Sequence, residues 1–131
     1  FRPVRIAGEN YIDGAAHSPT NADLVLSERP DLVIISSPMS LARSAITLHP
    51  RQAGRLHFRR RLAQEVRRLQ LAGIPVVSFQ PSTEDRNVMG EGGLSAMSES
   101  KNAAVVEQVY ATTLRRLARP EFARRLAVAG L

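Results

Sequence analysis

The sequence contains no cysteine among its 131 residues. Disulfide bonds, thiolate metal sites and a cysteine nucleophile are therefore excluded. Long hydrophobic runs are also missing, since no stretch approaches the roughly 18 apolar residues of a membrane-spanning helix. Hydrophobic residues make up 44% of the chain and charged residues 23%, which is typical of a globular protein rather than a disordered one. The chain is long enough for one domain with a core of its own.

Aromatic residues are few, at 5%. The net charge of +6 is the difference between 18 basic and 12 acidic residues, and the basic ones are 17 arginines and a single lysine, Lys101. A positive charge can indicate nucleic-acid binding. So lopsided an arginine content is explained more simply by a compositional bias of the coding genome, and the chain has no aromatic platform for stacking bases. We therefore expect no nucleic-acid partner. An arginine face that binds DNA is kept as a third hypothesis, which predicts a steeply salt-dependent affinity.

The first residue is Phe1 rather than methionine, and the segment FRPVRIAGENYID lacks the apolar core of a secretory signal. We expect this sequence to be the downstream part of a longer protein. The compartment stays open between the cytoplasm and the periphery of a membrane.

Three apolar segments have the character of β-strands. Residues 3–8 and 10–13 (PVRIAG and NYID) form a first strand region with a kink near Gly8. Residues 31–37 (DLVIISS) and 73–80 (GIPVVSFQ) are continuous apolar runs without polar alternation, the pattern of strands buried on both faces. Strands of this kind belong to parallel sheets, which need helical crossovers.

Helical patterns lie between these strands. Thr20 and Asp23 fit a capping box before a short helix at residues 24–27. A long helix is predicted over residues 55–73, with Gly73 as its stop. Residues 80–90 are expected to hold one capped helical turn at most, and residues 102–118 an amphipathic helix that ends before Pro120. The apolar positions are Phe58, Leu62, Val66 and Leu69 in the first long helix, and Val106, Val109, Tyr110, Thr113 and Leu117 in the second.

This order of elements predicts a layered α/β domain with a mainly parallel sheet. Sites in such sheets lie beyond the carboxyl ends of the strands. Asp13 follows the first strand region directly and is succeeded by Gly14. Asp-Gly is a common turn pair, so Asp13 is either a turn or cap residue or a carboxylate presented for chemistry.

The segment YIDGAAHSPTNADLV, followed by DLVIISSPMS, resembles the downstream half of a bacterial patatin-like phospholipase domain. The resemblance covers most of the chain in element order, but its specific motif is short, Asp13-Gly14-Ala15. It implies that residues 1–131 are the C-terminal portion of a single patatin-like domain, an incomplete three-layer α/β/α fold. It also implies a serine acyl hydrolase that cleaves lipid acyl esters, with Asp13 as the acidic member of a Ser-Asp dyad.

The serine of such a dyad sits in a Gly-x-Ser-x-Gly elbow, and a Gly-rich loop supplies the oxyanion donors; in the family both lie upstream of the aspartate. The nearest approach here, residues 93–97 (GLSAM), has Met97 where glycine is required and follows a loop rather than a strand. We reject it as the elbow. The missing N-terminal part of the domain is thus the expected partner of this chain, which alone should be inactive.

Other residues with chemical potential have plainer interpretations. His17 is close to Asp13 in sequence but fits a turn or packing role, and the resembled family uses no histidine. The turn at Ser36, Ser37 and Pro38 ends a strand and could line a cleft. Glu84 and Asp85 are interpreted as first-turn acids of a helix. Three further features are not interpreted as sites: His49, His57 and the glycines of residues 90–93 beside Lys101. The histidines lack the spacing of metal ligands, and the glycines lack the residue order of a phosphate-binding loop.

Five arginines of the long helix form a basic face that could rest on an anionic membrane, although a solvated helix face explains it as well; they are Arg59, Arg60, Arg61, Arg67 and Arg68. No metal or organic cofactor follows from the residues. The alternative to the hydrolase is a non-catalytic α/β module that binds a partner or small ligand at the strand tips.

Overall fold

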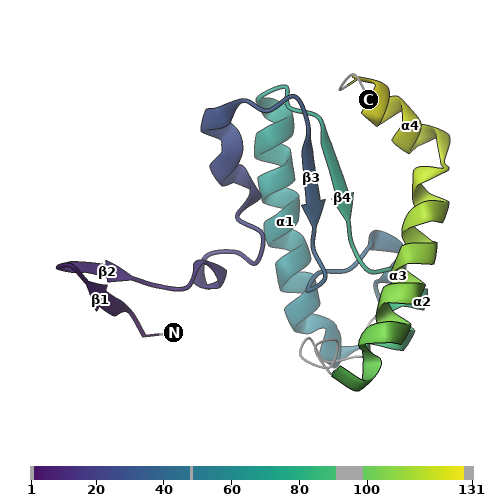
Figure 1. Cartoon of the computed structure of the whole chain (residues 1–131), viewed down its shortest axis with the longest axis horizontal. Coiled ribbons are helices and arrows are strands. Elements are labelled where there is room, and N and C mark those ends of the chain that lie inside the picture. Colours follow the sequence, from purple (N-terminus) through teal and green to yellow (C-terminus); the bar gives the residue numbers. More distant parts are fainter. Residues whose placement is uncertain (1, 48, 91–98, 129–131) are drawn as a thin grey trace.

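The structure, a computed structural model, describes residues 2–47, 49–90 and 99–128 and has a mixed α/β architecture (Figure 1). Short 3₁₀ segments at Gly14–Ala16, Ala22–Glu28, Arg43–Ala45, Pro50–Gln52 and Glu99–Lys101 connect the main elements. The strands and helices are, in chain order, β1 (Val4–Ile6), β2 (Glu9–Tyr11), β3 (Val33–Ser36), α1 (Ala53–Leu71), β4 (Val76–Phe79), α2 (Thr83–Met89), α3 (Asn102–Leu117) and α4 (Pro120–Val128).

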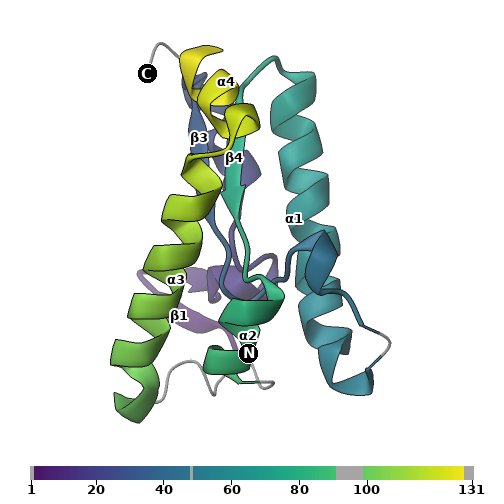
Figure 2. The same ribbon diagram turned by 90° about the vertical axis from the view of Figure 1, so that its right-hand side faces the viewer.

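Strands β3 and β4 pair in parallel, with Val33 opposite Val76 and Ser36 opposite Phe79. Helix α1 connects them, which confirms the predicted parallel pair with a helical crossover. Figure 2 shows this pair of strands between α1 and α3. The α/β class is therefore confirmed, and the carboxyl ends of the two strands lie at the same edge of the sheet.

Helix α1 forms where its apolar stripe predicts it. Leu62 and Leu69 are buried on one side of the helix, and Gly73 with φ of 79° ends it in the left-handed conformation. The amide of Ile74 closes this end by donating to the carbonyl of Leu69 at 3.0 Å. The core cluster contains Ala22, Ile35, Leu62, Leu69, Ile74 and Val76, with Leu26, Val33 and Val66 packed against it.

The expectation of a single kinked strand through the first residues is wrong. Strands β1 and β2 fold back on each other as an antiparallel hairpin, with Val4 opposite Tyr11. Ala7 and Gly8 both have positive φ, 52° and 90°, as the tight turn of a two-residue hairpin requires. The hairpin stands apart from β3 and β4 (Figure 1), so this region is not part of the parallel sheet.

Two predictions of local helical structure also need correction. Thr20 and Asp23 do not form a capping box, because the Thr20 hydroxyl donates to Glu65 instead and Asn21 occupies the cap position. The residues that follow are a 3₁₀ segment longer than the predicted helix. After β4, the structure has the seven-residue helix α2 rather than one turn at most, because Ser82 and Asp85 form a reciprocal capping box that stabilises it.

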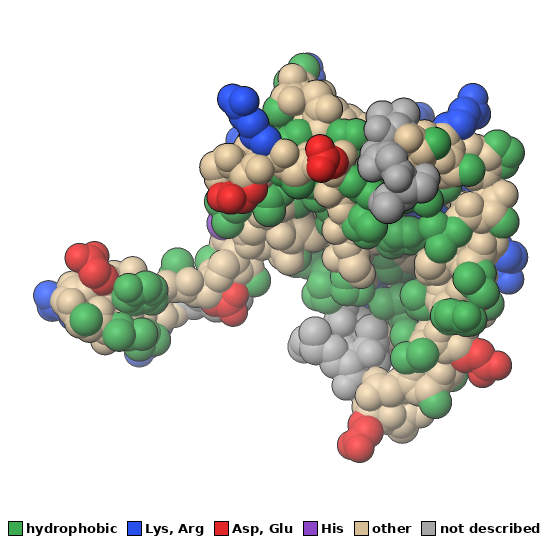
Figure 3. All heavy atoms as spheres, turned by 45° about the horizontal axis from the view of Figure 1, so that its top comes forward, with side chains coloured by type: hydrophobic (Ala, Val, Ile, Leu, Met, Phe, Trp, Pro, Cys, Tyr) green, Lys and Arg blue, Asp and Glu red, His purple; other side chains and the backbone are tan. Residues whose placement is uncertain are grey.

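The prediction that β3 is buried on both faces holds for only one of them. Ile35 is buried, whereas Ile34 on the opposite face is 61% exposed. The apolar side of α3 is exposed as well, and its buried residue is Thr112. In the described part of the chain these side chains are only partly covered, and those of α3 range from 36% exposed for Leu117 to 67% for Val106. Figure 3 shows hydrophobic groups along the α3 side of the molecule and on the hairpin. The exposed apolar residues of α3 are Val106, Val109, Tyr110, Leu114 and Leu117.

Candidate functional site

Asp13 lies two residues beyond the end of β2, at the start of the 3₁₀ turn Gly14–Ala16. Its Oδ1 accepts a hydrogen bond from the Ala15 amide at 2.8 Å, and the residue is exposed. Asp13 is therefore the cap of this turn, which is one of the two roles expected from its sequence. The cap occupies one carboxylate oxygen, and Oδ2 makes no hydrogen bond within the described part of the chain.

The turn after Asp13 is closed by Asn21. The Asn21 side-chain amide donates to the Gly14 carbonyl at 3.2 Å and to the Ser18 carbonyl at 2.6 Å. A Cβ atom at position 14 would lie 3.3 Å from this nitrogen, so the glycine allows the close approach. Asn21 has φ of 46°, a left-handed conformation that asparagine tolerates better than most residues. Gly14 thus makes room for Asn21 of its own loop.

Ser18 fills the inside of the loop of Asp13, which comprises residues 13–22. It is buried, and its hydroxyl oxygen accepts from the Thr20 amide at 3.3 Å and from the Asn21 amide at 3.4 Å. The Ser18 amide donates to the Gly14 carbonyl at 3.2 Å. The loop that carries Asp13 is therefore an ordered, hydrogen-bonded turn.

Helix α1 anchors the loop through Glu65, a residue that sequence analysis missed. One oxygen of its carboxylate, Oε2, accepts from the Thr20 hydroxyl at 2.6 Å and from the Ala22 amide at 3.1 Å. Glu65 is only 4% exposed. The available signal was its place on the helix, since it follows Leu62 by three residues and precedes Leu69 by four, on the apolar stripe.

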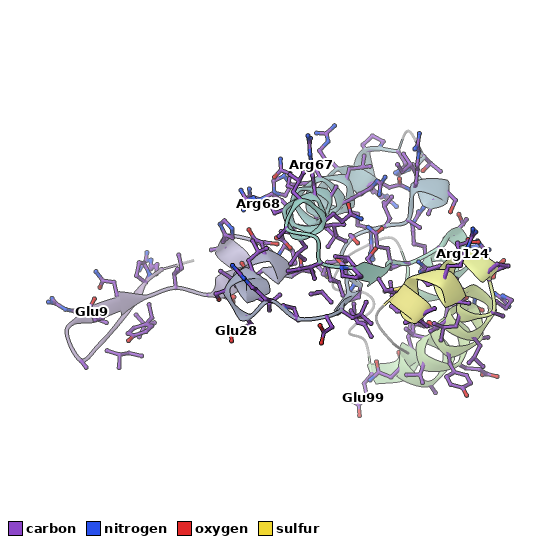
Figure 4. The ribbon with its side chains drawn as sticks, turned by 90° about the horizontal axis from the view of Figure 1, so that it is seen from above. Glu9, Glu28, Arg67, Arg68, Glu99 and Arg124 are labelled. Atoms are coloured by element: carbon purple, nitrogen blue, oxygen red, sulfur yellow. The ribbon has the colours of Figure 1, made fainter. Side chains whose placement is uncertain are left out.

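Two arginines of the proposed basic face reinforce this anchor. Arg61 donates to the His17 carbonyl at 2.9 Å, and Arg68 forms an ion pair with Asp23. Figure 4 shows Arg67 and Arg68 projecting from the side of α1 away from β3 and β4. Two members of the arginine face therefore also bind the segment that follows Asp13, and the Arg68 side chain remains 61% exposed while it does so.

A small cavity lies at the carboxyl ends of β3 and β4, with a volume of about 70 Å³. Its lining combines the two strand ends with α2 and α3, and includes Ser36, Pro38, Phe79, Gln80, Pro81, Asp85, Met89, Val109, Thr112, Thr113 and Arg116. The Ser37 carbonyl accepts from the amide and hydroxyl of Ser40, at 3.2 and 2.9 Å. These hydrogen bonds confirm the predicted turn after β3. The cavity lining shows that Ser36 and Pro38 also border a cavity.

Two charged groups border this cavity. Burial would raise the pKa of Asp85, but hydrogen bonds from the Ser82 backbone and from Thr112, Ser82 and Gln108 side chains lower it below 3.8. Burial lowers the pKa of Arg116, as does the neighbouring charge of Arg119, while Asp85 raises it. The cavity lining therefore contains one acidic and one basic side chain among apolar and uncharged polar residues.

The other predicted residues are not brought to Asp13 by hydrogen bonds. His17 ends the turn through its backbone, and its side chain is exposed. His49 accepts from the Arg51 amide at 3.2 Å, and His57 lies edge-on to Phe58. Glu84 and Asp85 are in the first turn of α2, as predicted. Most of the glycine-rich loop and the rejected elbow at residues 93–97 lie outside the described residues.

Metal-ligating residues do not cluster in the described part of the chain, where no group of three histidine or acidic side chains could hold an ion. Across residues 2–47, 49–90 and 99–128, no helix has both the length and the apolar character needed to cross a bilayer. No family model, curated protein or solved structure matches the chain. The functional inference therefore depends on the residues and their geometry.

Proposed function

We propose that this chain is the C-terminal portion of a patatin-like lipid acyl hydrolase and that Asp13 is the base of its Ser-Asp dyad. The observation that carries the proposal is the presentation of Asp13, an exposed carboxylate just beyond a strand, in the motif Asp13-Gly14-Ala15. Its turn is fixed to α1 through Glu65 and Arg61. A base on an anchored turn can meet a serine in one geometry, which proton transfer requires.

The proposed chemistry uses the two oxygens of Asp13 differently. Oδ1 stays bound to the Ala15 amide, which holds the carboxylate in place. Oδ2 accepts the proton of a serine hydroxyl while that oxygen attacks the ester carbonyl. The protonated Asp13 then gives the proton to the leaving alcohol, and a water molecule hydrolyses the acyl-enzyme in the same manner. The serine and the oxyanion donors belong to the part of the domain outside these residues, because Gly-x-Ser-x-Gly does not occur here.

The same proposal assigns β3 and β4 to a larger, mainly parallel sheet in a three-layer α/β/α domain. The exposed Ile34 and the exposed apolar side of α3 support it, since apolar groups of this size are normally covered. The isolated hairpin supports it too, because a two-stranded hairpin is marginal unless it packs against something. The partner is the rest of the same domain, and the substrate is a lipid or another acyl ester.

The substitution Asp13→Asn in the full-length protein tests the dyad. An asparagine oxygen can still accept from the Ala15 amide, so the turn should persist, but the amide cannot take a proton. We expect kcat/KM for a phospholipid or nitrophenyl ester to fall by about 10²- to 10⁴-fold, with an unchanged circular dichroism spectrum. Asp31→Asn, at the opposite end of β3, is the matched control and should keep wild-type activity. Wild-type turnover in Asp13→Asn would refute the assignment.

The mixed polar and apolar lining at the ends of β3 and β4 supports a second candidate, a non-catalytic α/β module that binds a partner or small ligand at the strand tips. A fluorophosphonate reagent separates the two candidates, because it labels activated serines. Labelling of one serine in the full-length protein, weakened in Asp13→Asn, supports the hydrolase. No labelled serine and no ester hydrolysis in the full-length protein support the binding module.

A further inference from the structure

Glu65 is a buried acid in the apolar stripe of α1, and this position needs an explanation. A carboxylate removed from water is unfavourable unless it is hydrogen-bonded. Here it accepts two hydrogen bonds, from Thr20 and Ala22, and both donors belong to the loop of Asp13. Because neither donor is on α1, the Glu65 carboxylate joins the helix to the loop.

A continuous path of bonds leads from Glu65 to Asp13. Glu65 holds residues 20 and 22, which flank Asn21 on both sides. The Asn21 side chain then holds the Gly14 carbonyl, next to Asp13 in the chain. The Asp13 carboxylate is in turn held by the Ala15 amide at 2.8 Å. Each hydrogen bond in this path therefore ends on a residue that is the same as, or next in sequence to, a residue of the following bond.

We infer that Glu65 is a positioning residue for Asp13, acting through Thr20, Ala22 and Asn21 to set the place of the Asp13 carboxylate relative to α1. This role rests on the proposed function of Asp13 as a base. Glu65 takes no proton from the substrate and does not touch it. Its loss lets the loop move against α1, and displacement of a catalytic group by about 1 Å can lower turnover by about 100-fold.

Two substitutions of Glu65 separate shape from hydrogen bonding. Glu65→Gln keeps an oxygen that accepts from Thr20 and Ala22, so kcat should stay within a few-fold of wild type. Glu65→Leu fills the space but leaves both donors without an acceptor, so kcat should fall about 10- to 100-fold. KM should change little in either variant, because Glu65 does not contact the substrate.

The matched control is Leu62→Ala, one turn earlier on the same stripe of α1. Leu62 is buried and makes no hydrogen bond to the loop with its apolar side chain. This variant should lower the melting temperature at least as much as Glu65→Leu, yet keep kcat when assayed well below its melting transition. Equal losses of kcat in the two variants would show a merely structural role and overturn the inference.

Hydrogen–deuterium exchange of the full-length protein gives a readout that does not depend on activity. The Ala15 and Ala16 amides should exchange faster in Glu65→Leu and at the wild-type rate in Glu65→Gln. Unchanged exchange in Glu65→Leu overturns the inference whatever the activity, as does faster exchange with unchanged kcat. If exchange accelerates but the wild-type protein hydrolyses no ester, the hydrogen-bond path is supported as the anchor of the loop and the proposed function fails.

Discussion

The guanidinium carbon of Arg116 lies 5.2 Å from the centroid of the Phe79 ring, so a cation on α3 stacks on the last residue of β4. The same guanidinium lies 5.3 Å from the ring of Phe122 on α4 and donates to the carbonyls of Ser78 and Gln80 at 3.0 and 3.3 Å. Arg116 therefore connects β4 with both C-terminal helices. Arg116 thus provides polar contacts that hold α3 beside the sheet, while much of the apolar side of that helix stays exposed.

Substitution Arg116→Lys should destabilise the protein by about 1–2 kcal/mol. An ammonium group cannot lie over both rings and donate to two carbonyls at once, as the planar guanidinium does. Urea denaturation measures the change. Arg115→Lys is the control, because its ion pair with Glu84 is exposed on both sides and should contribute less than about 1 kcal/mol. Similar losses in the two variants would contradict the role of Arg116.

Stability should decrease in acid because of Asp85. Hydrogen bonds hold the pKa of this carboxyl below 3.8 in the folded protein, against the ordinary value when unfolded. The unfolded chain therefore binds the proton more readily, so the stabilisation is complete above pH 3.8 and is lost as the pH falls through the folded pKa. Asp85→Asn should be less stable by up to about 1 kcal/mol at neutral pH, because the amide lacks the negative charge that the helix N-terminus favours. Its difference from wild type should shrink in acid.

Urea denaturation of Asp85→Asn and wild type at several pH values between 7 and 3 checks this expectation. Glu84→Gln leaves the capping box of Ser82 and Asp85 intact and should follow the wild-type profile. A gap between wild type and Asp85→Asn that stays constant with pH would contradict the assignment of acid sensitivity to Asp85.

The two glycines at the ends of α1 should respond oppositely to alanine. Gly73 has φ of 79° and open space around it, so Gly73→Ala should destabilise by about 1 kcal/mol from backbone strain alone. Gly54 lies in the first turns of the helix, also in open space but without positive φ, so Gly54→Ala should stabilise by up to about 1 kcal/mol. Thermal melts of both variants provide the test, and a loss at Gly54 equal to that at Gly73 would contradict it.

Local patterns in the sequence were enough for much of the fold. The spacing of Leu62 and Leu69 predicts α1, and the apolar runs predict β3 and β4 as a parallel pair. The reversal at Ala7 and Gly8 was missed because Ala-Gly is not one of the preferred pairs of such turns. The exposure of Ile34 and of the apolar side of α3 was missed because periodicity predicts which face is apolar, and not what covers it.

The place of Asp13 beyond a strand could be predicted from the sequence, since an acid followed by Gly14 after an apolar run is visible in the order of residues alone. What fixes Asp13 in space was decided only by the tertiary structure. Thr20 and Glu65 are 45 residues apart in the chain, and their hydrogen bond forms only because the core packs α1 against the preceding segment. Periodicity acts over a few residues and therefore determines helices and strands, whereas a buried carboxylate finds its donors only after distant segments have packed together.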